Sequence, residues 1–478
     1  MTSELSMGLL DLLRCPQCTT EFTFEHSPIQ PLASGAFGVL RCGTHEYPVI
    51  DGIPVIRNGH VSVHDHTTLW TEVPGPTVDK LVDLVRSPDP LAALVELLAF
   101  PPALPWGLEH TPIVRLPLTR GPGQRMLIAA RRREIRRLLN QPVSQHTAQD
   151  WMRLCYLRSR GTNPELYPYF LLRFGQPRML AALALYSVLD SGPKPILDLA
   201  CGFGHIMYLL AARPAPLWSI GVDRNFFQLW VARRWIATDC DFVCADAALR
   251  LPFADNSFAA SVCSDAFHCL PDQQLAYDEL RRCADNNTVL LDRVGNADID
   301  PRDSPHERTL DGYLTLTGTT STRILGEQEL LTSYLTGQGP ALATQRPLPE
   351  LRQEKWLTLV SSDDPKLFRD HDKPTYLPHA QGQLAINPIY RPRPHGDHIQ
   401  LRFMFPSDWY AFENATMRDY HPTQITLTHN EYQDLLAGRH TDHTDELTAR
   451  FVLTGMPPRY AHPPAPHRNS TSRTPIAD

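Results

Sequence analysis

The sequence has very little lysine and no long apolar run. Five lysines stand against forty arginines, a bias that we attribute to a GC-rich genome rather than to chemistry. No stretch of 18 or more residues is continuously apolar, so we expect no membrane span. Residues 1–13 lack the basic, apolar and small-residue order of a secretory signal, and we therefore expect a cytoplasmic protein.

Excess positive charge is also missing. The formal net charge is −7 at pH 7, which argues against a nucleic-acid partner held mainly by a global basic field, although binding through a local basic patch stays possible.

At 478 residues the chain is longer than one hydrophobic core usually serves, and we expect two or three domains. The ten cysteines sit in a reducing compartment, which favours metal ligation or burial over disulfide bonds. We assign six of them to apolar cores: Cys155, Cys240, Cys244, Cys263, Cys269 and Cys283.

Short apolar runs alternate with helical stretches between residues 194 and 294. The first run, 195–200, has no helical stripe, as is typical of a buried parallel strand, and it ends in Cys201-Gly-Phe-Gly-His205. Glycines there let the backbone approach a ligand at the carboxyl edge of a sheet. The alternation predicts an α/β domain with a Rossmann-like, doubly wound sheet. Its further strands are predicted at 218–222, 241–244, 258–263 and 288–294.

Carboxylates follow these strands in order. Asp223 comes twenty-one residues after Gly202, where a carboxylate accepts hydrogen bonds from both hydroxyls of an adenosine ribose. Asp246 follows the third strand and is suitably placed to accept from the exocyclic amine of adenine. The third glycine of the dinucleotide fingerprint would fall at Met207. The sequence therefore lacks the small residue that lets the helix pack closely where a pyrophosphate binds. The pattern favours S-adenosylmethionine, which has no phosphate, over a dinucleotide.

These segments resemble the class I S-adenosylmethionine-dependent methyltransferases, over about residues 170–361. The motifs that carry the resemblance are Asp198-Leu-Ala-Cys-Gly-Phe-Gly204, Asp223, Asp246, Leu251-Pro-Phe-Ala-Asp-Asn-Ser-Phe258 and Ser264-Asp-Ala-Phe-His-Cys-Leu-Pro-Asp272. The resemblance implies a methyltransferase fold with S-adenosylmethionine as the cofactor.

The resemblance also implies roles for individual residues. Asp223 would hold the ribose, and Asp246 with Ala247 the adenine. His268, just beyond the fourth strand, is the candidate general base, which is needed only if the methyl acceptor must lose a proton. Asp198, Gly202 and Gly204 would border the methionine part, and the further cofactor-binding candidates are Ala200, Arg224 and Ser264.

A second pattern near the start of the chain predicts a metal site. Cys15-Pro-Gln-Cys18 and Cys42-Gly-Thr-His45 form a C-x2-C, x23, C-x2-H array, which brings three thiolates and one imidazole together tetrahedrally. Because all four ligands come from the protein, no coordination position stays open. We therefore predict a structural zinc ion.

The first 57 residues resemble the Trm112-like zinc-ribbon family. The similar segments are Leu9-Leu-Asp-Leu-Leu-Arg-Cys-Pro-Gln-Cys18 and Tyr47-Pro-Val-Ile-Asp-Gly-Ile-Pro-Val55. Such a domain often partners a methyltransferase, and the resemblance implies that here it is fused in cis. His45 stands where a cysteine is common in that family. A zinc module before this fold is also similar to the bacterial 23S ribosomal RNA guanine-N1 methyltransferases.

Five parts are expected along the chain. They are a zinc ribbon (1–60), a helical linker or cap (61–169), the methyltransferase domain (170–362), a C-terminal α+β accessory module (363–456) and a disordered tail rich in Pro, His and Ser (457–478). The accessory module opens with a predicted hairpin whose strands, 384–390 and 398–405, are joined by the Pro-rich turn 391–397.

Two side-chain clusters have open interpretations. The first is a group of arginines on a helix predicted at 125–140, namely Arg131, Arg132, Arg133, Arg136 and Arg137. It is either the solvated face of an amphipathic helix or a phosphate-binding patch. The second packs in a core or lines the acceptor pocket; it comprises Asp408, Trp409, Tyr410, Glu413, Tyr420 and His421.

Three functional hypotheses follow. The leading one is a methyltransferase for a small-molecule acceptor in specialised metabolism, because residues 251–272 are similar to quinone and natural-product methyltransferases. The second is a ribosomal or transfer RNA methyltransferase, favoured by the zinc module and the arginine helix. The third is a non-catalytic adaptor that binds a protein through the zinc ribbon.

Overall fold

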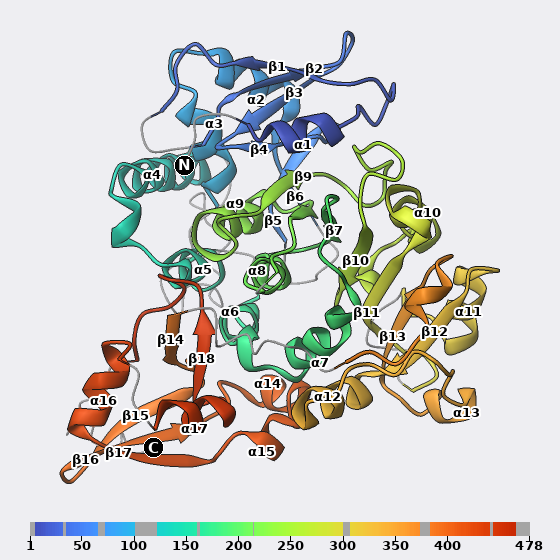
Figure 1. The fold of residues 1–478 in the computed structure, drawn as a ribbon. Helices are drawn as coiled ribbons and strands as arrows, with labels where there is room; N and C mark the ends of the chain where they lie inside the picture. The colour runs from blue at the N-terminus through green and yellow to red at the C-terminus, as the bar shows by residue number, and fades with distance from the viewer. Residues whose placement is uncertain are drawn as a thin grey trace.

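The computed structural model describes residues 5–31, 35–65, 72–100, 122–159, 163–213, 215–299, 306–372, 383–439 and 443–464. Figure 1 shows an N-terminal module at the top, a central α/β domain in the middle and a C-terminal module at the bottom. Within those ranges no helix is both long and apolar enough to cross a membrane.

A seven-stranded sheet forms the centre of the molecule, with the strand order β12-β13-β11-β10-β7-β8-β9. The strands from β9 to β11 are parallel, and β13 pairs antiparallel with both β11 and β12. This arrangement confirms the predicted α/β sheet, although the edge strand β12 was not predicted. The strands are β7 (Ile196–Leu199), β8 (Ser219–Asp223), β9 (Asp241–Cys244), β10 (Ala260–Ser264), β11 (Val289–Gly295), β12 (Thr322–Gly326) and β13 (Trp356–Ser361).

Helices connect and cover these strands, because each buried parallel strand must be followed by a crossover. Helix α7 packs along α12, and α8 follows β7 directly through the glycine-containing turn. The helices of this domain are α7 (Pro177–Leu185), α8 (His205–Ala211), α9 (Phe226–Val231), α10 (Gln273–Cys283), α11 (Leu310–Thr317), α12 (Glu327–Thr336) and α13 (Leu348–Leu351).

The N-terminal module continues the β9 edge of the central sheet (Figure 1). Val55 forms a parallel bridge with Cys244, and the Ile56 amide donates to the Cys244 carbonyl over 2.8 Å. The two sheets are therefore joined by backbone hydrogen bonds. The module consists of α1 (Met7–Leu12), β1 (Thr23–His26), β2 (Gly38–Arg41), β3 (Glu46–Ile50) and β4 (Ile53–Pro54).

A buried carboxylate fastens the same module to the helix that follows β8. Asp51 is fully buried, and its Oδ2 accepts from Trp230 Nε1 and Arg234 Nε, each over 2.7 Å. Because a buried charge is stable only when it is paired and hydrogen-bonded, this contact ties the N-terminal module to the central domain.

Residues 61–169 were predicted to be helical, but the segment begins with a hairpin. Strands β5 (His60–Asp65) and β6 (Glu72–Thr77) pair antiparallel, because Val61 and Val63 alternate with polar residues in the strand period. Helix α5 packs on the central domain, where Trp151 meets Trp230 with ring centroids 4.6 Å apart. The helices of this segment are α2 (Val78–Arg86), α3 (Leu91–Leu98), α4 (Pro122–Leu139), α5 (Ala148–Tyr156) and α6 (Leu166–Leu171).

The C-terminal module has a hydrophobic core of its own. Its three-stranded sheet has the order β15-β16-β17, and β14 pairs with β18 at the end of the module. The strands are β14 (Gln383–Ile386), β15 (Tyr390–His395), β16 (His398–Phe403), β17 (Gln424–Thr428) and β18 (Leu453–Met456). The helices are α14 (Asp408–Glu413), α15 (Met417–Tyr420), α16 (His429–Leu436) and α17 (Thr444–Ala449).

The predicted hairpin in this module was wrong in its first strand and its turn. The observed hairpin consists of β15 and β16, in which His395 pairs with His398, so most of the predicted turn 391–397 is strand. Pro392 and Pro394 lie on an edge strand, where the missing amide hydrogen is tolerated. Residues 383–386, predicted as part of the hairpin, pair with β18 instead.

The predicted disordered tail begins with an ordered stretch. In residues 457–464 Tyr460 is 1% exposed, and its hydroxyl donates to the Phe170 carbonyl over 2.8 Å. The same hydroxyl lies 2.9 Å from His205 Nε2. Burial of this aromatic ring offsets the cost of ordering a Pro-rich segment. Residues 465–478, also predicted to be disordered, lie outside the described residues.

Candidate functional site

A cavity of about 700 Å³ opens at the carboxyl ends of the parallel strands. Ligands of open α/β sheets bind at this edge. Nine of the ten residues predicted for the cofactor or for catalysis line the cavity, and Gly204 does not. The nine are Asp198, Ala200, Gly202, Asp223, Arg224, Asp246, Ala247, Ser264 and His268.

The turn after β7 presents backbone to the cavity. Ala200 and Gly202 adopt left-handed conformations with φ of 58° and 55°, and the Gly202 amide donates to Asp223 Oδ2 over 2.9 Å. Gly204 also has a positive φ, of 68°, and a Cβ there would meet the Ala232 Cβ at 3.2 Å. Gly204 therefore serves the turn and the packing of α8.

Asp198, in β7, is the most buried carboxyl group on the cofactor side of the cavity. It is 2% exposed, and its Oδ2 has no hydrogen-bond partner among the described residues. Burial, and then the nearby negative charge of Asp223, raise the pKa of Asp198 well above its usual value. The buried carboxyl group therefore gains a proton more readily than an exposed aspartate does, and a cationic ligand group beside it would oppose that effect.

Asp223 and Asp246 are held by backbone amides. Asp223 Oδ1 accepts from the Asn225 amide over 2.8 Å, and Asp246 Oδ1 accepts from the Ala248 amide over 3.0 Å. A carboxylate has about four lone-pair sites, so each group keeps the capacity to accept from a ligand hydroxyl or amine.

Arg57, from the N-terminal module, reaches this part of the site. Its Nη2 lies 3.1 Å from Asp246 Oδ2, and its Nη1 donates to the Arg224 carbonyl over 3.0 Å. Only 5% of the Arg57 side chain is exposed. Sequence reasoning missed Arg57, because nothing in the local pattern connects it with a residue 189 positions away.

Asp265 directly follows β10 and lies buried among three arginines. Arg173 Nη1 and Arg178 Nη1 donate to its Oδ2 over 3.0 and 2.9 Å, while Arg293 donates to Oδ1 and the Tyr169 hydroxyl to Oδ2. Burial acts to raise the pKa of Asp265, but Arg293, Arg178 and Arg173 together hold it well below its usual value. Asp265 is therefore ionised and too weak a base to accept a proton.

His268 lies at the same end of the cavity. It is 8% exposed, and its ring centroid is 5.5 Å from that of Trp356, the first residue of β13. Trp356 also stacks under Arg293, whose Cζ is 3.6 Å from the ring centroid. Both Trp356 and Arg293 line the cavity and were missed from the sequence. An arginine inside the apolar run of β11 was the available signal.

The six residues of the C-terminal aromatic and acidic cluster lie in different surroundings. Trp409 and Glu413, on α14, line the cavity, and Glu413 lies 3.5 Å from Arg293. Tyr410 and His421 are buried in the module core. The remaining members are Asp408, which is exposed at the start of α14, and Tyr420, whose hydroxyl donates to the Gly175 carbonyl over 2.9 Å.

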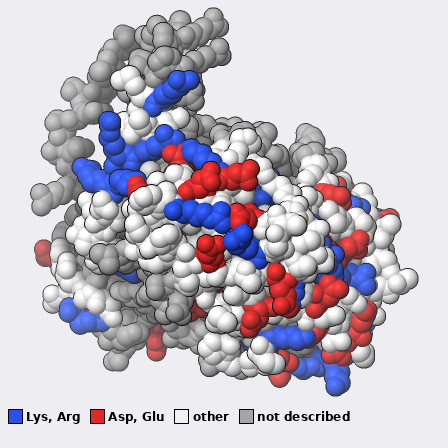
Figure 2. Space-filling model, turned by 90° about the horizontal axis from the view of Figure 1, so that it is seen from above, with Lys and Arg blue, Asp and Glu red and all other residues white. Residues whose placement is uncertain are grey.

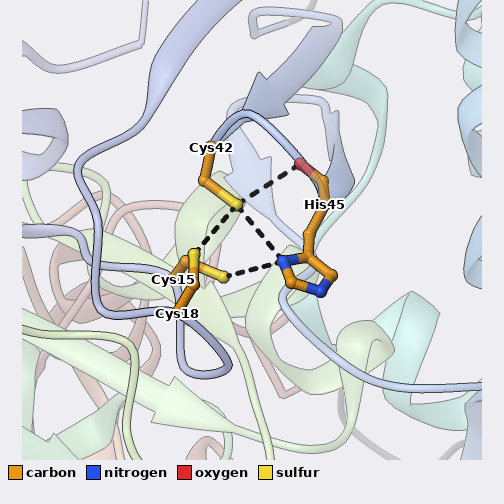
Figure 3. A group of neighbouring side chains, drawn as sticks. All are labelled: Cys15, Cys18, Cys42 and His45. Carbon is orange, nitrogen blue, oxygen red and sulfur yellow. Dashed lines mark hydrogen bonds between the residues drawn. The ribbon is translucent and has the colours of Figure 1, made fainter.

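The four predicted metal ligands meet in the N-terminal module (Figure 3). Cys15 Sγ and Cys42 Sγ lie 3.6 and 3.5 Å from His45 Nδ1, and Cys18 Sγ lies 3.5 Å from Cys42 Sγ. A tetrahedral zinc ion at ordinary bond lengths separates its ligand atoms by roughly 3.5–3.8 Å. The donor set and its spacing therefore fit zinc.

Comparison with known proteins shows what the central residues are similar to. Residues 196–287 match the family described as a methyltransferase domain. The chain is 30% identical over 112 residues to the demethylmenaquinone methyltransferase of Thermotoga maritima, which covers 23% of this chain and 48% of that protein. It is 35% identical over 115 residues to the enzyme of the same name from Thermus thermophilus, covering 23% and 52%.

The family match lies in the central domain, and the chain spans about half the length of the curated relatives it matches. A solved structure, the YcgJ protein of Bacillus subtilis, is 18% identical and covers 39% of this chain and 98% of that protein, with a TM-score of 0.28. Residues 196–287 are therefore similar to known methyltransferase domains.

Proposed function

We propose that this protein transfers a methyl group from S-adenosylmethionine to a small-molecule acceptor. The observation that carries the proposal is the order of three carboxyl groups along one cavity edge. Asp246, Asp223 and Asp198 follow or lie in β9, β8 and β7, which are neighbours in the sheet. The acceptor then belongs beyond Asp198, over β10, β11 and β13.

Each carboxyl group has a role that its surroundings support. Asp246 would accept from the adenine amine while Arg57 fixes its orientation, and Asp223 would accept from the ribose hydroxyls. Asp198, whose pKa is raised by burial and whose Oδ2 has no hydrogen-bond partner in the described chain, would be stabilised in its charged form beside the cofactor's ammonium group. The turn at Ala200 and Gly202 would lie along the methionine part.

The cofactor supplies an electrophilic methyl carbon on a sulfonium, and the protein supplies alignment. Rate enhancement in such a displacement comes largely from holding the two reactants in line. The residues of α6 and α14, among them Tyr169 and Trp409, cover the acceptor end and exclude water from it. We keep His268 as the candidate base for an acceptor that must lose a proton.

A small acceptor fits the cavity and the relatives better than RNA does. The two curated relatives are named for a quinone precursor, which is a small molecule. In the arginine helix α4, Arg131 pairs with Glu134, Arg132 with Glu96 and Arg136 with Asp89. Among the described residues on the upper face, acidic side chains are interspersed with the basic ones (Figure 2).

We also propose a structural zinc ion at Cys15, Cys18, Cys42 and His45, in a module of the Trm112-like type. The four ligand atoms lie within 4.8 Å of one another, and the gathering of three thiols and one imidazole supports it. The ion would brace the turn that carries Cys15 and Cys18 against the turn between β2 and β3, on the module that provides Arg57.

Calorimetry with the purified full chain tests the function. We expect S-adenosylmethionine to bind, Asp223→Ala to abolish binding, and the control Asp239→Ala, in an exposed loop, to bind normally. An intact protein that binds no S-adenosylmethionine contradicts the proposal and favours the adaptor. Salt-sensitive RNA binding that is lost when Arg133 and Arg137 are neutralised favours the RNA methyltransferase.

A further inference from the structure

At the proposed acceptor end of the cavity, three arginines surround a single aspartate. Arg173, Arg178 and Arg293 all donate to one carboxylate, that of Asp265. Their side chains are 11%, 4% and 4% exposed, so water screens them little. Three buried guanidinium groups around one carboxylate leave positive charge that other groups must balance.

Two further carboxylates balance two of the arginines. Glu327 Oε1 lies 2.7 Å from Arg293 Nε, and Glu413 Oε2 lies 3.5 Å from Arg293 and 3.8 Å from Arg178. Arg173 has no second carboxylate partner in the described parts of the chain. It is the guanidinium whose charge is least compensated.

Arg173 also keeps hydrogen-bonding capacity. Its Nη1 donates to Asp265 and, over 3.5 Å, to Gln176 Oε1. Within the described residues its Nη2 donates to no acceptor, and Arg173 lines the cavity. A guanidinium with one engaged edge presents its other N–H groups to a carboxylate or phenolate oxygen.

The carboxylate that this arginine shares points to the acceptor side of the cavity. The cofactor's expected partners follow β9, β8 and β7, whereas Asp265, Arg293 and Trp356 belong to β10, β11 and β13 on the other side of β7. Arg173 shares Asp265 with Arg293 and therefore lies in the second group.

Aromatic side chains surround the same end. Trp356, Trp409 and Tyr169 line the cavity, and Trp409 is 41% exposed with its ring centroid 6.1 Å from that of Tyr169. Large, rigid aromatic surfaces of this kind favour planar conjugated ligands.

We infer that the acceptor is an anionic aromatic compound whose carboxylate or phenolate oxygen binds Arg173 Nη2 while its ring lies against Trp356 and Trp409. This inference rests on the proposed function, since it names the substrate class of the same site. An uncharged quinone-like ring would leave Asp265, shared with two other arginines, as the carboxylate partner of Arg173 among the described residues.

Binding to the full chain saturated with S-adenosylhomocysteine tests the inference. The probes are benzoate, 1-naphthoate and 4-hydroxycinnamate, each beside its neutral amide, followed by tryptophan fluorescence and calorimetry. We expect at least one anion to bind about tenfold or more tighter than its amide, and that preference to weaken as salt is added. Equal binding of every pair, or binding of none of the anions, overturns the inference.

Arg173→Gln keeps one donor for Asp265 and removes the charge, so we expect it to abolish the preference for the anion. Arg173→Lys restores the charge and should recover part of the preference, while Arg137→Gln, an exposed change on α4, leaves it intact. An unchanged preference in a folded Arg173→Gln protein contradicts the inference. So does a loss of affinity for S-adenosylhomocysteine alone, because that assigns Arg173 to the cofactor.

The two proposals fail in distinguishable ways. If wild-type protein binds neither S-adenosylmethionine nor S-adenosylhomocysteine, the proposed function fails. If it binds both and does not discriminate between anion and amide, only the inference about the acceptor fails.

Discussion

Arg57 and Asp246 form an ion pair across the boundary between the N-terminal module and the central domain, with 3.1 Å between Nη2 and Oδ2. Arg57 also donates to the carbonyl of Arg224, the residue after Asp223. One side chain from the start of the chain thus contacts both loops that we assign to the adenosine part of the cofactor. The N-terminal module therefore contributes to the site that we propose for the cofactor.

Replacing Arg57 should therefore weaken cofactor binding without unfolding the protein. In Arg57→Gln the Asp246 carboxylate loses its buried partner, and we expect the affinity for S-adenosylmethionine to fall about tenfold, measured by calorimetry. Arg86→Gln is the matched control, because Arg86 pairs with Glu46 on the exposed side of the same module. Equal affinities in Arg57→Gln and wild type would show that the pair does not position Asp246.

Removing the Asp51 carboxylate should cost far more stability than removing an exposed one. Asp51→Asn leaves Arg234 buried without its counter-ion, and we expect the free energy of unfolding to fall by about 3–5 kcal/mol. Glu46→Gln breaks a partly exposed pair with Arg86 and should cost less than about 1 kcal/mol. Urea denaturation measures both, and similar losses in the two variants would contradict the role of Asp51.

Metal removal should loosen the N-terminal module. We expect about one zinc ion per chain by mass spectrometry, and we expect Cys42→Ser to lose it and to lower the Tm by about 5 °C or more. Cys269→Ser, which changes a cysteine outside the cluster, should retain the metal. A wild-type protein that purifies without zinc, and whose Tm a chelator leaves unchanged, rules the site out.

Cofactor affinity should depend on pH through Asp198. Its pKa is raised by burial and by the charges of Asp223 and Asp292, against the opposing effect of Arg173. Below the raised pKa the empty site holds a neutral carboxyl, so binding a cationic group releases a proton and the affinity increases as pH rises. Calorimetry in buffers of different ionisation enthalpy detects that proton. Asp198→Asn should remove the pH dependence, and a wild-type affinity that is flat with pH would refute the assignment.

The effect of His268→Asn on turnover separates two kinds of acceptor. An acceptor that is already anionic needs no base, and we then expect kcat to fall less than about tenfold. Loss of a true general base costs about 10²–10⁴-fold. Once the acceptor is known, single-turnover rates measured across pH decide whether the acceptor needs a base. A large loss that shows a new pH profile would make His268 the base.

The meeting of the three predicted carboxyl groups in one cavity was predictable because its signals are local. Each strand is a short apolar run, and each carboxyl group lies in or directly after its own strand, so sequence order and spatial order agree for Asp198, Asp223 and Asp246. The metal ligands were predictable for the same reason, since each pair lies within four residues.

The acceptor half was not predictable, because its residues come from distant segments. Arg173 precedes the sheet, Arg293 lies in β11 and Glu413 lies in the C-terminal module, and only the folded chain brings them to Asp265. The C-terminal hairpin was misplaced because proline was taken as a turn signal, although an edge strand such as β15 tolerates it.

Tyr460 has a consequence for the order in which the protein forms. Its hydroxyl joins His205, at the start of α8 beside the glycine turn, to the Phe170 carbonyl in α6. Phe170 and His205 line the cavity, as do Trp409 and Glu413 of the C-terminal module. A ribosome must therefore release nearly the whole described chain before Tyr460 can support the cavity, and a nascent chain that has folded only its central sheet still lacks the residues that the C-terminal module adds.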